Sequence, residues 1–181
     1  MNKTVYDMTM GTSQMLTCME ERLQQLDADA VVTTFGQELN PFTYGIAKAD
    51  MLIRGGNPDN MKFGDTLNND QFSDYKFDYI ISNPPFGIDW KREAQAVEAE
   101  ARLRANGRFG AGLPSKSDGQ LLFMLNGVAK LADDGTHGCR AAASKPAGCA
   151  GRRPSLAFDV RFRRTCGCGS ISSGAIVISE D

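Results

Sequence analysis

The feature that most constrains the fold is an alternation of β-prone and helix-prone segments over the first 138 residues. Residues 4–6, 31–36, 61–63 and 77–82 are β-prone. Apolar residues recur at helical spacing between Met15 and Leu26. Pro41 suits the first turn of a second helix, which Gly55 and Gly56 close. Strands that alternate with helices predict an α/β fold, a mostly parallel sheet with helices on both faces.

The second half of this region contains two further helical patterns. Residues 89–104 are rich in Ala, Glu and Arg, which predicts an exposed helix, and residues 106–117 form a glycine-rich loop. Asp118 is placed to cap a last helix, whose apolar residues recur as far as Leu131. Similarly, Ser13 is placed to cap the helix that begins near Met15.

Polar side chains stand at the end of each predicted strand. Asp7, Glu38, Asp65 and Asn83 all lie at or just after these ends. In sheets of parallel strands, ligands bind beyond the carboxyl ends of the strands. A carboxylate after the second strand is where such a fold contacts a ribose, although solvated strand-end carboxylates are the alternative interpretation of Glu38 and Asp65. Four polar residues at one edge of the sheet predict a ligand site there.

The run Asn83-Pro84-Pro85-Phe86 follows the most strand-like segment. It suits the methylation of an exocyclic amino group, whose lone pair is delocalised into the base. The Asn83 side-chain oxygen and the Pro84 carbonyl can accept the amino protons and localise that lone pair, while the prolines fix the backbone. Phe86 offers a flat face for a flipped-out base. A plain turn that ends the strand is the alternative, since these dipeptides are common in turns.

Four ordered motifs resemble one family, the modification (M) subunits of type I restriction-modification systems. They are residues 36–41 (GQELNP), 64–67 (GDTL), 77–87 (FDYIISNPPFG) with Trp90 and Lys91, and 117–123 (SDGQLLF). The resemblance covers residues 4–138. It implies a Rossmann-like class I S-adenosylmethionine-dependent methyltransferase fold, here incomplete, that methylates adenine N6 in DNA. It also implies a specificity (S) subunit and a restriction (R) subunit as partners.

The same resemblance assigns roles to individual residues. Asn83, Pro84, Pro85 and Phe86 would form the site for the target base. Asp7 and Gly11 would belong to the cofactor loop after the first strand. Glu38 would accept hydrogen bonds from the ribose hydroxyls of the cofactor, and Asp65 would lie against its adenine and amino group.

The cofactor loop departs from the family pattern. That pattern has Asp-Pro and then, two residues later, Gly-Ser-Gly, whereas Met8 and Ser13 replace the proline and the second glycine here. Glycines in such a loop let the backbone approach a ligand without a Cβ in the way. The departures therefore predict weaker binding of S-adenosylmethionine.

Two other functions stay open at this point. A methyltransferase of the same fold can act on cytosine N4, an RNA base or a protein glutamine amide. Alternatively, the chain can be a catalytically inactive remnant, which the altered loop favours.

Residues 139–181 differ in composition from residues 1–138. The first 138 residues hold 13 Lys and Arg against 19 Asp and Glu, whereas the last 43 hold 7 against 3 and four of the five cysteines. These cysteines lack the spacing of a zinc site. Residues 148–169 show no helix or strand period, and only residues 174–178 again resemble a strand. We therefore expect a partial methyltransferase domain at 1–138 and a tail at 139–181 that is not native to this fold.

Charge and hydropathy bear on location and partners. The net charge of −2 is unlike that of a free-standing DNA-binding protein, so another subunit is expected to supply most of the contact with DNA. No apolar run is long enough to span a membrane, and the N-terminus has no signal-peptide core. These features predict a cytoplasmic protein with no membrane contact, and the cysteine spacing predicts no metal.

Overall fold

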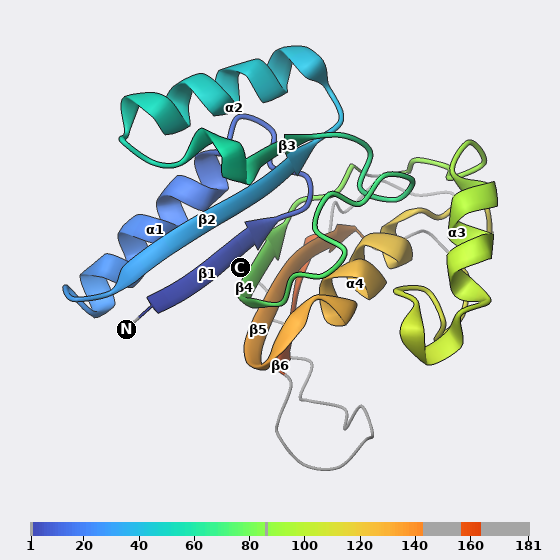
Figure 1. Ribbon diagram of the computed structural model, residues 1–181. Helices are drawn as coiled ribbons and strands as arrows, with labels where there is room; N and C mark the ends of the chain where they lie inside the picture. Colours follow the sequence, from blue (N-terminus) through green and yellow to red (C-terminus); the bar gives the residue numbers. More distant parts are fainter. Residues whose placement is uncertain (1, 86, 143–156, 164–181) are drawn as a thin grey trace, which may run out of the picture.

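The computed structural model describes residues 2–85, 87–142 and 157–163, which form one six-stranded sheet flanked by helices (Figure 1). The strands are β1 (Asn2–Asp7), β2 (Val31–Glu38), β3 (Met61–Phe63), β4 (Phe77–Ser82), β5 (Leu131–Ala142) and β6 (Ala157–Arg163). Their order in the sheet is β3-β2-β1-β4-β5-β6. Strands β1 to β5 run parallel, and β6 pairs antiparallel with β5. The predicted α/β class and mostly parallel sheet are confirmed.

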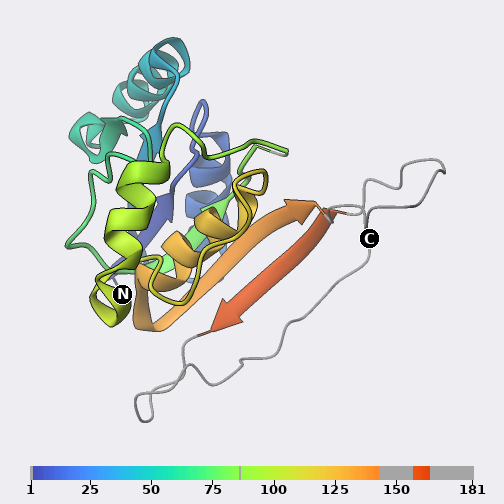
Figure 2. The ribbon, with the colours of Figure 1, turned by 90° about the vertical axis from the view of Figure 1, so that its right-hand side faces the viewer.

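Four α-helices cover the two faces of the sheet. They are α1 (Gln14–Leu26), α2 (Pro41–Ile53), α3 (Ala94–Ala101) and α4 (Gln120–Ala129), with short 3-10 turns at Pro58–Asn60 and Arg104–Asn106. Helices α1 and α2 pack on β1, β2 and β3, whereas α3 and α4 lie on the other face (Figures 1 and 2). No helix within these described ranges is long and apolar enough to cross a membrane.

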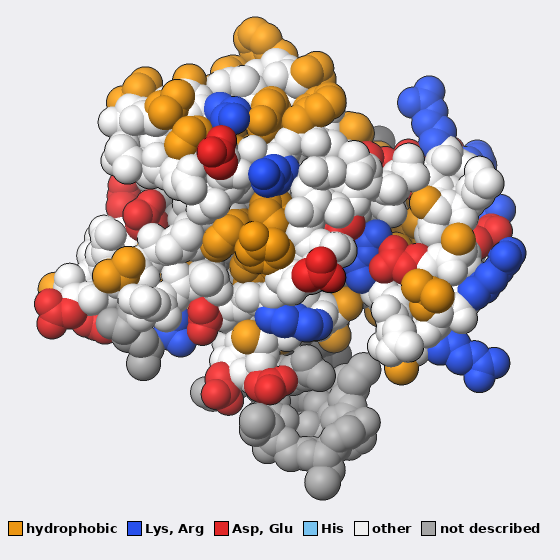
Figure 3. All heavy atoms as spheres, in the orientation of Figure 1, with side chains coloured by type: hydrophobic (Ala, Val, Ile, Leu, Met, Phe, Trp, Pro, Cys, Tyr) orange, Lys and Arg blue, Asp and Glu red, His pale blue; other side chains and the backbone are white. Residues whose placement is uncertain are grey.

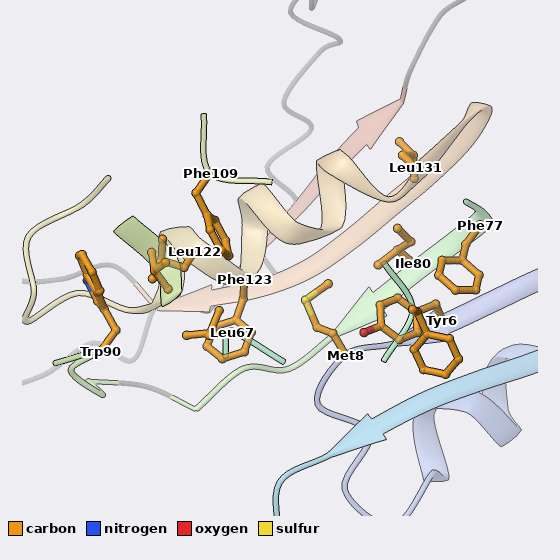
Figure 4. Packing of buried hydrophobic residues seen from close by; sticks show 12 residues of the cluster. Tyr6, Met8, Leu67, Phe77, Ile80, Trp90, Phe109, Leu122, Phe123 and Leu131 are labelled. Carbon is orange, nitrogen blue, oxygen red and sulfur yellow. The ribbon is translucent and has the colours of Figure 1, made fainter. Parts of the chain in front are cut away.

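The two faces of β1 separate the hydrophobic core into two clusters. Side chains alternate along a strand, so Val5 enters the cluster under α1 and α2, and Tyr6 enters the cluster under α3 and α4. The Tyr6 ring stacks on Phe77 of β4, with ring centroids 4.6 Å apart. In Figure 4, Met8 lies between Tyr6 of β1 and Phe123 of α4. The parallel register pairs Asp7 with Ile81, so the carboxyl ends of β1 and β4 lie side by side.

Helix α2 begins and ends as its sequence predicts. The Asn40 side chain accepts hydrogen bonds from the N–H groups of Phe42 and Thr43, and Pro41 occupies the first turn. Gly55, with φ of +76°, closes the helix. Figure 3 shows hydrophobic side chains gathered over α2, where Phe42 and Ile53 are 77% and 85% exposed. The helix therefore buries only one narrow side.

Two of the predicted helices are shorter than expected. Helix α4 ends at Ala129, and Leu131 begins β5 instead, where it pairs with Phe77. The predicted exposed helix at 89–104 is α3 alone, followed by a 3-10 turn. Its first residues are not helical because the buried Trp90 turns inward, where its indole N–H donates to the Ser115 carbonyl.

The expected irregular tail contains regular structure. Strand β5 crosses residue 138 and continues to Ala142, and Ala157–Arg163 forms β6, so the expectation of no strand at 148–169 is wrong there. A strand period is present there, because Phe158, Val160 and Phe162 alternate with charged residues, but the surrounding Gly, Arg and Pro residues obscure this short run. The strand expected at 174–178 lies outside the described residues. Whether 139–181 is native to the fold stays a prediction.

Candidate active site

A cavity of about 610 Å³ lies at the carboxyl edge of the sheet. Loops that follow β1, β2, β3 and β4 form its walls, together with the start of α4. The lining residues are Met8, Thr9, Glu38, Leu39, Asp65, Thr66, Leu67, Asn83, Pro85, Ile88, Asp89, Arg92, Glu93 and Phe123. Parallel strands bring these loops together, so residues up to 115 positions apart share one pocket.

Glu38 connects two of the loops. Its Oε2 accepts a hydrogen bond of 2.9 Å from the Gly11 backbone N–H, and its Oε1 accepts one of 2.8 Å from the Asn40 N–H. Gly11 has a φ of +56°, a conformation that favours glycine. The carboxylate is thus held at the cavity wall, and each of its oxygens has a further lone pair for a ligand hydroxyl.

Asp65 lies on the neighbouring loop, after β3, where the Gly64 N–H donates to the Glu38 carbonyl. Its Oδ1 accepts a hydrogen bond of 2.9 Å from the Leu67 N–H, which fixes the carboxylate. Glu93 also lines the cavity, and partial burial together with the negative charge of Asp65 raises the pKa of Glu93. With Glu38 and Asp89, the cavity carries four carboxyl groups against the single guanidinium of Arg92. Such a lining suits a ligand with hydroxyl or amino donors and a positive charge.

Asp7 and Gly11 lie behind the cavity rather than on its surface. Asp7 is 1% exposed, and its Oδ1 accepts a hydrogen bond of 2.9 Å from the Thr9 N–H. Burial raises the pKa of Asp7 to about 7. Within the described residues, this contact shapes the loop rather than the pocket. The side chain therefore acts on the site through Thr9, which lines the cavity.

The two altered positions of this loop have distinct surroundings. Met8 lines the cavity, and its Sδ accepts a hydrogen bond of 3.2 Å from Asn126 Nδ2. Ser13 adopts a φ of +68°, its hydroxyl does not cap α1, and among the described residues that buried hydroxyl has no hydrogen-bond partner. The expected capping role of Ser13 is wrong because the left-handed backbone turns its side chain away from the helix start.

The run after β4 contributes two residues to the cavity. Asn83 and Pro85 are exposed and line it, whereas Pro84 is buried outside the lining. Phe86 lies outside the described residues. Within those residues the Asn83 amide makes no hydrogen bond, so its oxygen is available to a ligand.

Sequence reasoning did not identify Asp89, Arg92 and Glu93 as site residues. They lie in the segment whose composition predicts an exposed helix, and the approach of Glu93 to Asp65 spans nearly thirty positions of the chain. Their nearness to the Asn83 run was the one available signal.

Comparison with known proteins agrees with this geometry. A Listeria monocytogenes protein described as a class I S-adenosylmethionine-dependent methyltransferase has the same fold, with a TM-score of 0.59 at 19% identity over 78% of this chain and 39% of that one. The methyltransferase subunit of a type I restriction-modification system from Streptococcus thermophilus has a TM-score of 0.60 at 30% identity, over 76% of this chain and 29% of that one. The fold is therefore that of the class I S-adenosylmethionine-dependent methyltransferases.

The family follows from the sequence comparison. A model of the N-6 DNA methylase family matches residues 1–143. The chain belongs to this family. The MjaIX methylase subunit of Methanocaldococcus jannaschii, a type I restriction enzyme component, is 26% identical over 137 residues, 75% of this chain and 24% of that protein. The HindI methylase subunit of Haemophilus influenzae is 28% identical over 134 residues, which cover 72% of this chain and 28% of that protein. The resemblance to type I methylase subunits is confirmed, and the chain spans about a quarter of the length of these curated relatives.

Proposed function

We propose that this chain is part of an adenine-specific DNA methyltransferase of a type I restriction-modification system. It would transfer a methyl group from S-adenosylmethionine to the N6 amino group of an adenine flipped out of DNA. The observation that carries the proposal is the cavity that brings Glu38, Asp65 and Asn83 together, in a chain of the N-6 DNA methylase family.

The donor set of the cavity fits S-adenosylmethionine. Glu38 would accept hydrogen bonds from the ribose hydroxyls, and Asp65 would accept one from an amino group. The excess of carboxyl groups favours a ligand that carries a sulfonium and an ammonium charge. When bound, the cofactor supplies a methyl group activated by the positive sulfur.

Asn83 would act on the target base. Its exposed side-chain oxygen would accept one proton of the adenine amino group, and the Pro84 carbonyl would accept the other. These hydrogen bonds draw the nitrogen lone pair out of conjugation with the ring, so the nitrogen becomes a nucleophile. No covalent enzyme intermediate is needed, and the role assigned to Phe86 is stacking on the base.

DNA, the S subunit and the R subunit are the proposed partners. The net charge of −2 and the carboxyl groups at the cavity give this chain little attraction for phosphates. Other parts of the complex would therefore hold the duplex. The recognition sequence would be read by the S subunit.

Product analysis tests the proposal. The chain would be incubated with unmethylated duplex DNA, its partner subunits and methyl-labelled S-adenosylmethionine, and the DNA digested to nucleosides. We expect label in N6-methyldeoxyadenosine, with none in deoxycytidine, RNA or a glutamine-containing peptide supplied in parallel. Label in N4-methylcytosine or glutamine instead would assign another acceptor.

An inactive remnant is the second candidate, favoured by Met8 in the cavity wall and by the strained Ser13. Calorimetric titration with S-adenosylmethionine separates the two, since a remnant would show no heat of binding.

A further inference from the structure

Arg108 is a buried cation outside the cavity that contacts the cavity wall. It follows the 3-10 turn at Arg104–Asn106, and its side chain is 11% exposed. Its guanidinium donates hydrogen bonds to the backbone carbonyl oxygens of Thr66, at 2.7 Å, and Leu67, at 3.3 Å. These two residues line the cavity directly after Asp65. One side chain therefore holds two consecutive carbonyls of the wall from behind.

The same wall is connected to the loop after β1. The Thr66 hydroxyl donates to the Met8 carbonyl oxygen at 2.6 Å. Arg108 also donates to the side-chain oxygen of Asn126 in α4, at 3.1 Å, and the Asn126 amide donates to the Met8 sulfur. Arg108 thus donates to other oxygens of the two residues that hold Met8, the Thr66 carbonyl and the Asn126 side-chain oxygen.

The position of Arg108 is fixed by Glu100 of α3. The guanidinium contacts both carboxylate oxygens of Glu100, at 2.7 and 2.6 Å, in a bidentate pair. Burial raises the pKa of Glu100, but the hydrogen bonds and the charge of Arg108 outweigh this effect and lower the pKa overall. Glu100 is therefore ionised at neutral pH, and α3 is joined to the wall of residues 65–67 through Arg108.

We infer that Arg108 is a positioning residue for the cofactor: by holding the Thr66 and Leu67 carbonyls, it sets the place of the Asp65 carboxylate. The chain of contacts is short, because the Leu67 N–H is itself the donor to Asp65 Oδ1. The inference that the ligand is S-adenosylmethionine rests on the proposed function. The inference that Arg108 orders this wall does not.

Lys130 supplies a matched control from the same buried network. Its ammonium lies 2.6 Å from Asp70 Oδ2, which is also 3.6 Å from the Arg108 guanidinium. Lys130 is 2% exposed, so its loss also disrupts a buried ion pair. Among the described contacts, however, Lys130 has none with Thr66 or Leu67. Substitution of either residue would lower the stability of the fold, but only substitution of Arg108 would loosen the cavity wall at Thr66 and Leu67.

The first experiment compares Arg108→Lys, Arg108→Met and Lys130→Met in the full chain by titration with S-adenosylmethionine. Each is measured at a temperature where its unfolding curve shows it folded. We expect both Arg108 variants to weaken binding by about tenfold or more, which corresponds to the loss of one or two charge-assisted hydrogen bonds. The Arg108→Lys variant should not restore cofactor binding, because one ammonium group cannot make the several directed hydrogen bonds of the planar guanidinium. Lys130→Met should weaken binding much less than either Arg108 variant, because Lys130 makes no described contact with Thr66 or Leu67. Equal losses in all three variants would overturn the inference.

The second experiment needs no cofactor. Hydrogen exchange would be followed at the amides of Leu67 and Asn69, which donate to the Asp65 side chain and to its carbonyl. Both should exchange faster in the Arg108 variants than in Lys130→Met, while the amides of β1 are unchanged. Parent-like exchange at Leu67 and Asn69 in the Arg108 variants would refute the positioning role. If the parent chain binds no cofactor, the proposed function fails, and this exchange measurement still decides the role of Arg108.

Discussion

The Gly11 backbone N–H donates a 2.9 Å hydrogen bond to Glu38 Oε2, and so a carboxylate at the end of β2 fixes the loop after β1. The other oxygen of Glu38 holds the Asn40 N–H at the start of α2. A residue assigned to ligand binding is therefore also the residue that joins the two loops. A ligand hydroxyl would meet a carboxylate that is already oriented.

We expect Glu38→Ala to weaken binding of S-adenosylmethionine and to lower the free energy of unfolding by about 1–3 kcal/mol. The Gly11 and Asn40 N–H groups lose their acceptor in this variant. Glu38→Gln keeps one oxygen and should lie between the parent and the alanine variant. Urea unfolding and calorimetric titration measure the two effects. An alanine variant as stable as the parent would show that water replaces the carboxylate without cost.

The altered cofactor loop predicts weak cofactor binding that can be repaired. Ser13→Gly alone should stabilise the chain by about 1 kcal/mol, because Ser13 has a φ of +68° and its hydroxyl caps nothing. The pair Met8→Pro with Ser13→Gly should bind S-adenosylmethionine more tightly than the parent. Thermal unfolding and calorimetry measure these changes. Equal affinity in the parent and the repaired chain would show that the departures do not affect the site.

Asn83→Ala should abolish methyl transfer and leave cofactor binding nearly unchanged. Asn83 lies in the cavity at the strand end, and its proposed partner is the target amine rather than the cofactor. Loss of a transition-state hydrogen-bond acceptor of this kind costs about 100-fold or more in rate. Transfer assays under saturating cofactor measure the rate, and calorimetry measures the affinity. An alanine variant that retains the parent rate would remove Asn83 from the catalytic site.

Asp7 should make stability depend on pH. Burial raises the pKa of Asp7 to about 7, from an ordinary 3.8, so the folded state retains the proton to higher pH than the unfolded state does. The protonated Asp7 therefore stabilises the folded state fully below about pH 4. As the pH rises from about 4 to about 7, this contribution falls by about 1.4 kcal/mol per pH unit, and above about pH 7 it is lost. Asp7→Asn should remove this slope.

The test for Asp7 is a difference between two unfolding profiles. The free energy of unfolding of Asp7→Asn minus that of the parent should rise steadily from about pH 4 to about pH 7. Above about pH 7 this difference should stay constant. Burial lowers the pKa of His137 to about 4, which costs stability as the pH falls, but this effect is common to both proteins and cancels. Parallel pH profiles would contradict a raised pKa for Asp7.

The sequence predicted the strand ends well because they follow local signals. The buried run Phe77–Ser82 and the prolines after it place Asn83 at the sheet edge, and the Asn40-Pro41 pair starts α2. Arg108 could not be predicted in this way, since its partners Thr66 and Leu67 lie about forty residues earlier. Leu131 was assigned to the wrong element because apolar spacing alone does not show where a helix yields to a buried strand.

The strand order has a consequence for how the chain unfolds. β1 lies between β2 and β4, so one half of the sheet runs outward from it as β2 and β3, and the other half as β4 and β5. The two hydrophobic clusters lie on opposite faces of the sheet, and each takes residues from both halves. One joins Leu67 to Phe77, and the other has Met61 in its core with Ile81 packed against it. The cavity takes Glu38 and Asp65 from the first half and Asn83 and Phe123 from the second. Halves that share both cores should melt together, so a molecule bound in the cavity should raise the midpoint of one cooperative transition rather than merge two.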